Sequence, residues 1–192
     1  SSDVTVQDST IFRVEVYDAA PTVTNSILTS EYPICLRDPD GSLSNFSGNT
    51  FPTMESQKIL VGGTVNDNAS LNIVDGLGKY QLNSPVDIRP GAQWTLFPGV
   101  YVDVTISHQI EVSAGGQLVA VDSTFVGTPT LIKVDGVADL TGCTIEEGQV
   151  HYRNGSSGSI VGWAGGVHEQ LFLQSSDVTV QDSTIFRVEV YD

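Results

Sequence analysis

Oxygen-bearing side chains grouped on one turn are the first feature of this chain that could do chemistry. The segment RDPDGS places Asp38, Asp40 and Ser42 close together. Hard oxygen ligands on a turn are the kind that calcium prefers. The rest of an EF-hand loop is missing around them, so Asp38 and Asp40 are candidate calcium ligands on ligand type alone. No other metal or cofactor is expected.

Carboxylates and histidines elsewhere in the chain do not form a catalytic pattern. Enzymes that cleave polysaccharides need paired carboxylates, whereas the acids of this chain are scattered. Glu146 and Glu147 are adjacent at a predicted corner, where a solvated edge explains them better than an acid/base couple. The three histidines, His108, His151 and His168, have no ligand motif around them. The sequence therefore predicts that this chain is not an enzyme.

Charge and composition exclude other classes of function. The chain has 23 acidic and 8 basic residues, giving a formal net charge of −15. Binding to a phosphate backbone requires clustered cations, so nucleic acid is not an expected partner. No apolar run is long enough to cross a bilayer. Gly, Ser, Thr, Asp, Asn and Val are abundant, which is typical of strands joined by tight turns.

The strongest pattern in the sequence is an exact repeat. Residues 1–18 read SSDVTVQDSTIFRVEVYD, and residues 175–192 read the same, at an offset of 174 residues (175 − 1). A cloning duplication is one explanation. The better one is a protein that repeats every 174 residues with little divergence. Residues 1–192 would then be one period plus an overlap of a continuous tandem-repeat domain.

A shorter repeat of apolar–x–apolar triplets lies inside the long one. Each triplet leads through a turn to a second alternating run. The triplets begin at Val14, Ile34, Ile59, Val86, Ile110, Ile132, Val150, Leu171 and Val188. The steps from Val14 to Val188 divide one period of 174 residues (188 − 14) into eight segments of roughly 22 residues. Two independent periodicities therefore agree.

Segments of this kind predict an all-β right-handed parallel β-helix, a solenoid with about eight coils per repeat. Short alternating strands cannot bury one face alone, but stacked coils build a continuous core. A sharp bend is expected at Asp8, Asn25, Gly48, Asp122 and Gly142, because Asp, Asn and Gly tolerate the left-handed backbone conformation. With about 4.8 Å per coil, one repeat would extend roughly 40 Å.

The stretch from Tyr80 to Phe125 resembles coils of secreted right-handed β-helix surface proteins of the Bacteroidetes type. The residues that carry the resemblance are Gly91, Leu96, Pro98, Gly99, Val100, Ile110, Val112, Gly115, Gly116 and Leu118. The segment YPICLRDPDGSLSNFSGNTF is similar to coils that close such units. The resemblance implies an extracellular protein, exported to the cell surface, with a role in adhesion or filament building.

These observations predict a structural module that forms the shaft of a long extracellular filament or adhesin. Near-identical repeats add length, whereas an enzyme needs one site. Adjacent copies of the repeat are the expected partners, along with identical chains in a multi-chain fibre. The alternatives are a carbohydrate-binding or carbohydrate-cleaving β-helix domain and a calcium-dependent adhesin. Cys35 and Cys143 are expected to be buried free thiols, or to bridge neighbouring chains.

Overall fold

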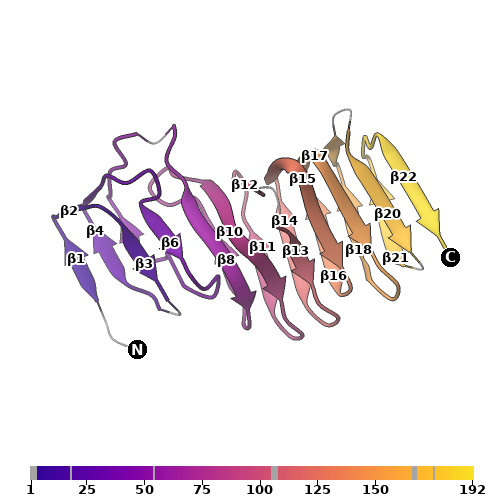
Figure 1. The fold of residues 1–192 in the computed structure, drawn as a ribbon, viewed down its shortest axis with the longest axis horizontal. Coiled ribbons are helices and arrows are strands. Elements are labelled where there is room, and N and C mark those ends of the chain that lie inside the picture. The colour runs from indigo at the N-terminus through magenta and orange to yellow at the C-terminus, as the bar shows by residue number, and fades with distance from the viewer. Residues whose placement is uncertain (1–3, 18, 54, 105–107, 166–167, 175) are drawn as a thin grey trace.

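The chain is an all-β rod with its two ends at opposite tips (Figure 1). The computed structural model describes residues 4–17, 19–53, 55–104, 108–165, 168–174 and 176–192. Residues 1–3, 18 and 175 of the duplicated segments thus lie outside the described residues. No helix in the described part is long and apolar enough to cross a membrane.

The first face of the rod holds nine short strands, each of which opens a coil. They are β1 (Thr5–Gln7), β4 (Thr22–Thr24), β7 (Phe46–Ser47), β9 (Ala69–Leu71), β11 (Gln93–Leu96), β14 (Gln117–Val121), β16 (Val137–Thr141), β18 (Ser157–Val161) and β21 (Asp177–Gln181). They form a three-stranded sheet, β1-β4-β7, and a six-stranded sheet from β9 to β21.

The second face is one sheet of 11 strands that runs the length of the rod. Its strands are β3 (Val14–Val16), β6 (Ile34–Leu36), β8 (Ile59–Val65), β10 (Lys79–Ile88), β12 (Tyr101–Asp103), β13 (Ile110–Val112), β15 (Thr124–Val134), β17 (Thr144–Tyr152), β19 (Ala164–Gly165), β20 (Gln170–Gln174) and β22 (Arg187–Tyr191). A two-stranded sheet, β2 (Thr10–Ile11) and β5 (Ile27–Leu28), lies at the N-terminal corner.

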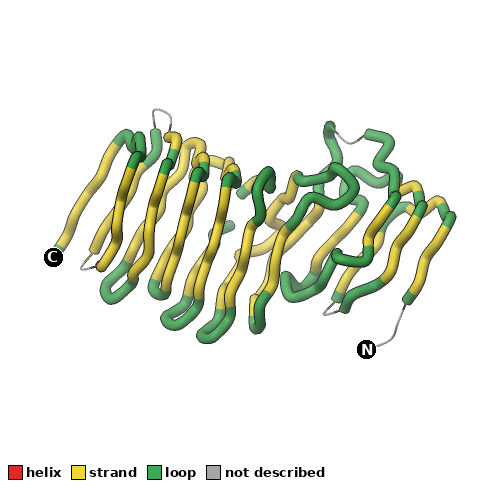
Figure 2. The backbone as a smooth tube through the Cα atoms, turned by 180° about the vertical axis from the view of Figure 1, so that it is seen from behind, coloured by secondary structure: helices red, strands yellow, loops and turns green. Residues whose placement is uncertain are grey.

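Coils of this chain stack in parallel, so the predicted parallel β-helix is confirmed at the level of fold. Every named strand pair is parallel, and partners lie about one coil apart in sequence, as Val14 and Ile34 do. The described chain makes about nine turns, which is eight per 174 residues plus the overlap. Figure 2 shows the coils side by side, with irregular loops gathered in the N-terminal half.

Alternation along each strand places apolar side chains inside the coils. Trp94 in β11 and Trp163 after β18 are fully buried in the core. Tyr152 is also buried, and its hydroxyl donates a hydrogen bond to the Ala138 carbonyl oxygen at 2.7 Å. Large aromatic groups therefore pack inside the coils, and the buried Tyr152 hydroxyl has a hydrogen-bond partner.

The corner between the two faces has the predicted left-handed conformation. The φ angles are 50° at Asp8, 50° at Asn25, 67° at Gly48, 44° at Asp122 and 62° at Gly142. A Cβ atom on Gly48 would lie 2.6 Å from Asn25 Oδ1, and one on Gly142 would overlap Asp122 Oδ1. The side chain of one coil therefore occupies the space above the glycine of the next.

Small polar side chains follow this bend and join the coils from the inside. Ser26 Oγ accepts the Ser9 N–H at 3.2 Å and donates to the Thr24 carbonyl oxygen at 2.9 Å. Ser26 N–H in turn donates to Asn49 Oδ1 in the next coil at 3.1 Å. The Asp or Asn residue, as at Asp8 and Asn25, thus forms the bend, and the serine after it pairs backbone groups across coils.

One sequence alignment of triplets is wrong. The repeat pattern placed Ile59 opposite Val86, but Ile59 pairs with Tyr80, and Val86 pairs with Gly63. A register shift in β10 between Leu82 and Val86 accommodates both pairings. The pattern missed this because Gly63 carries no apolar side chain, although its backbone occupies a triplet position.

Candidate functional site

The first face of the rod has a seam between its third and fourth coils. On this face β7 and β9 belong to different sheets and do not pair. On the second face the ladder β6-β8-β10 crosses the same coils without interruption. The coils are therefore held together on one side and open on the other.

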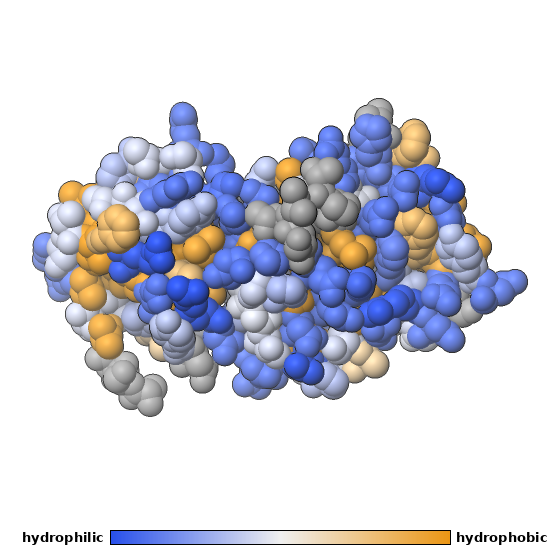
Figure 3. Space-filling model, in the orientation of Figure 1, coloured by the Kyte–Doolittle hydropathy of each residue, from blue (hydrophilic) through white to orange (hydrophobic). Residues whose placement is uncertain are grey.

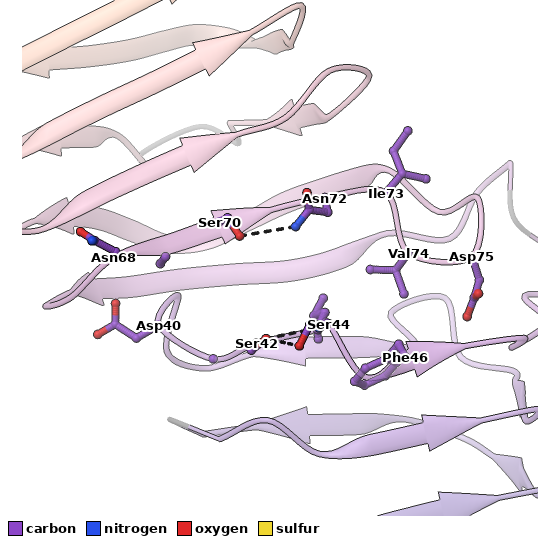
Figure 4. A pocket seen from close by; sticks show the side chains of 13 residues that line it. Asp40, Ser42, Ser44, Phe46, Asn68, Ser70, Asn72, Ile73, Val74 and Asp75 are labelled. Atoms are coloured by element: carbon purple, nitrogen blue, oxygen red, sulfur yellow. Dashed lines mark hydrogen bonds between the residues drawn. The ribbon is translucent and has the colours of Figure 1, made fainter.

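A groove of about 460 Å³ occupies this seam. We call it the seam groove, and define it by the residues that line it: Asp40, Gly41, Ser42, Leu43, Ser44, Phe46, Asn68, Ala69, Ser70, Asn72, Ile73, Val74 and Asp75. Figure 4 shows Ser70 and Asn72 on one side, facing Ser42 and Ser44 across the opening. The lining residues include the two carboxylates of Asp40 and Asp75 but no Lys, Arg or His, so the groove is acidic, with both polar and apolar side chains.

Asp75 bridges the two coils at one end of the seam groove. Its carboxylate accepts the Gly48 N–H at 2.9 Å, the Asn49 N–H at 3.0 Å and the Asn49 side-chain amide at 2.9 Å. Asn49 also donates to the Val23 carbonyl oxygen at 2.9 Å. A side chain thus supplies the hydrogen bonds that a neighbouring strand supplies in other coils. Sequence reasoning missed Asp75 because its partners lie 26 and 27 residues away.

Asp40, one of the two candidate calcium ligands, bridges the coils at the other end. Its two carboxylate oxygens accept the Asn66 N–H at 3.1 and 2.9 Å, and Oδ2 also accepts the Asn66 side-chain amide at 3.2 Å. Asp38 Oδ1 accepts the Asp40 N–H at 3.4 Å. The structure therefore gives Asp40 a structural role, and calcium binding at Asp38 and Asp40 stays a prediction.

Other sequence candidates are spread along the rod. Among the described residues no three His, Cys, Asp or Glu side chains are grouped to hold a metal ion. His151 lies beside Phe172, with ring centroids 4.2 Å apart, and burial lowers its pKa. The backbone N–H of Glu147 faces the buried carboxylate of Glu169 at 3.4 Å.

Both cysteines are buried, and they do not bridge one another within the chain. A bridge to a neighbouring chain stays a prediction. Burial raises the pKa of the Cys143 thiol to about 11 and also raises that of Cys35. The side-chain amide of Asn83, in the irregular part of β10, lies 3.9 Å from the Cys35 sulfur. Both thiols are therefore protonated at neutral pH and are poor nucleophiles.

We expect Asp75→Ala to destabilise the chain by about 2–4 kcal/mol. The substitution leaves two backbone N–H groups and one amide of the adjoining coil without their carboxylate acceptor. Asp67→Ala is the matched control, because Asp67 is exposed on the same coil, and we expect it to change the free energy of unfolding by less than about 0.5 kcal/mol. Urea denaturation measures both, and equal effects would contradict the bridging role.

No protein-family model, curated protein or solved structure matches this chain.

Proposed function

We propose that this chain is a repeat module in the shaft of a long extracellular filament or adhesin. One observation carries the proposal: the same coil occurs at both ends of the rod, once covered and once uncovered. Val16 in β3 is 1% exposed beneath the next coil, whereas its copy in β22, Val190, is 72% exposed. A coil like residues 19–36 would bury Val190 as it buries Val16.

An ion pair between the first two coils also supports the continuation of the solenoid beyond β22. Arg37 in the second coil donates to Glu15 Oε1 in the first at 3.1 Å. The Arg37 guanidinium, with a hydrogen bond from Tyr17, lowers the pKa of Glu15 to about 2. Because the folded state binds this proton more weakly, the pair favours folding above pH 4.5 and loses this effect as the pH falls towards 2. Glu189, the copy of Glu15, would meet the arginine of the following repeat.

The distribution of exposed apolar residues supports contacts with adjacent repeats at the two ends of the rod. Figure 3 shows a side surface that is largely hydrophilic, with apolar residues near both ends of the rod and smaller apolar areas between them. Val4 and Phe12 in the first coil and Val188 and Val190 in the last are among the exposed hydrophobic residues. An adjacent copy at each end would cover apolar edges that otherwise invite aggregation. Export to the cell surface is proposed from the resemblance of the Tyr80–Phe125 coils alone.

Electron microscopy of a chain with several consecutive 174-residue repeats tests the proposal. Eight coils of about 4.8 Å predict an axial period of roughly 38 Å. A shorter axial advance would indicate rods that tilt or wind around one another in a multi-chain fibre. Separate compact particles without a period would refute the shaft.

A further inference from the structure

Backbone groups of two strands face the seam groove without a strand between them. Leu71 in β9 accepts the Phe97 N–H at 3.1 Å, so Leu71 points towards the following coil. Neighbouring residues of a strand point their backbone groups to opposite edges. The N–H and carbonyl of Ser70 therefore point towards the groove.

The opposite wall of the groove, formed by β7, also has backbone groups that point into the groove. Asn45 and Ser47 use their carbonyl oxygens to accept N–H groups of the preceding coil at 3.1 Å each. Phe46, between them, therefore points its backbone groups to the other edge, where its N–H donates to the Leu43 carbonyl oxygen at 3.1 Å. The Phe46 carbonyl is thus an acceptor on this wall of the groove, and the donor and acceptor of Ser70 lie on the other wall.

The size of the groove fits a short strand. A strand takes about 3.3 Å along its axis, 4.8 Å between neighbours and 10 Å between faces, which is roughly 160 Å³ per residue. The volume of about 460 Å³ corresponds to three residues, and β9 has three residues. Figure 4 shows the opening between these strands running along their length.

Side chains around the groove define what the strand would carry. Leu43, Phe46, Ala69 and Val74 are apolar lining residues of the groove, and Asp40 and Asp75 place a negative charge at each end. Apolar side chains of the strand would therefore pack on these apolar residues, and basic residues at the ends would meet the two carboxylates. The net charge of −15 disfavours an acidic segment.

We propose that the seam groove binds an extended, neutral-to-basic peptide segment, which enters between β7 and β9 as an added parallel strand. Main-chain hydrogen bonds to Phe46 and Ser70 would supply the affinity, as in other strand-addition complexes. The added strand would fill the gap on the first face between the sheet that ends at β7 and the sheet that begins at β9. This binding site is independent of the shaft function, although an array would repeat it once every 174 residues.

NMR titration of the isotope-labelled 192-residue chain with acetyl-Lys-Val-Thr-Val-Lys-amide tests the proposal. Its central Val-Thr-Val alternation matches Val4-Thr5-Val6 at the first-face strand of another coil. We expect saturable shifts of the Ser70 and Phe46 amide signals by about 1 mM peptide. The acidic analogue with Glu in place of both Lys residues should bind at least about tenfold more weakly.

A pair of variants separates strand addition from side-chain binding. Ser70→Pro removes the N–H that faces the groove but leaves the bonds towards β11, and should weaken binding at least about tenfold. Ser70→Ala removes the hydroxyl and keeps that N–H, and should bind within about twofold of the unmodified chain. Circular dichroism establishes that each variant is folded, and a peptide N-methylated at its central residue gives the same test without changing the protein.

Three results would each overturn the proposal. The first is no saturable shift at about 10 mM peptide, well above the millimolar affinity of a weak complex. The second is equal binding of the N-methylated and unmodified peptides, which would exclude main-chain pairing. The third is a response of Ser70 and Phe46 to a neutral oligosaccharide but not to the peptide, which would assign the groove to a different class of ligand.

Discussion

Val16→Asp should destabilise the 192-residue chain by about 3–5 kcal/mol, whereas Val190→Asp should change its stability by less than about 0.5 kcal/mol. The two positions are copies of each other, in coils of identical sequence. Val16 is 1% exposed and Val190 is 72% exposed. An aspartate at position 16 would be a buried charge without a partner, but at position 190 it would be solvated.

Chemical denaturation combined with amide hydrogen exchange measures this difference. Because each coil of a solenoid contacts its neighbours alone, we expect the loss of protection in Val16→Asp to centre on the first two coils. Val16→Ala is a milder control, with an expected cost of about 1–3 kcal/mol from lost apolar contact. Equal effects of the two aspartate substitutions would show that the coil after β3 does not provide the burial.

The Val16→Asp and Val190→Asp substitutions also test whether consecutive repeats form one continuous solenoid. In a chain of two repeats, the second copy of residues 19–36 would follow β22 directly. Val190→Asp should then cost about as much as Val16→Asp, again about 3–5 kcal/mol. If Val190→Asp left the free energy of unfolding of that chain unchanged, the junction between repeats would not be a continuous solenoid. This result would contradict the proposed shaft.

Gly158→Ala should destabilise the chain by at least about 3–5 kcal/mol, or prevent folding of the C-terminal coils. Gly158 in β18 has φ 149°, and a Cβ atom there would overlap the carbonyl oxygen of Ala138 in β16. That oxygen also accepts the Tyr152 hydroxyl at 2.7 Å. The backbone of β18 therefore cannot move away from β16 without disturbing a buried hydrogen bond.

Gly155→Ala is the matched control for this position. Gly155 also has a positive φ, 81°, but nothing lies within 4 Å of the site where its Cβ would be. We expect it to cost about 1–2 kcal/mol, from the left-handed conformation alone. Thermal unfolding of both variants separates backbone conformation from close approach, and a cost at Gly155 as large as that at Gly158 would contradict the steric argument.

Local preferences made the corners of the coils predictable from sequence. Asp8, Asn25 and Asp122 have positive φ angles, as their positions before a small polar residue indicated. The reason is that Asn and Asp adopt this conformation without help from distant residues. The strand triplets were predictable for a similar reason, because apolar alternation requires one face of each strand to be buried.

The pairing of β8 with β10 was not predictable in the same way. Gly63 occupies a register position opposite Val86, but it contributes nothing to an apolar pattern. The sequence predicted Asp40 as a calcium ligand, because its carboxylate lies close in sequence to that of Asp38. In the folded chain its oxygens accept hydrogen bonds from Asn66, 26 residues away, a contact that no local pattern encodes.

The sequence by itself determined that coils of about 22 residues stack in parallel and where five of those coils bend. Those properties follow from periodicity and from the backbone preferences of single residues. The tertiary structure alone decided that the ladder is broken between β7 and β9, that Asp75 and Asp40 bridge the break, and that a groove lies between them. Whether two strands pair depends on the separation of their coils, which is set by every loop that the coils contain.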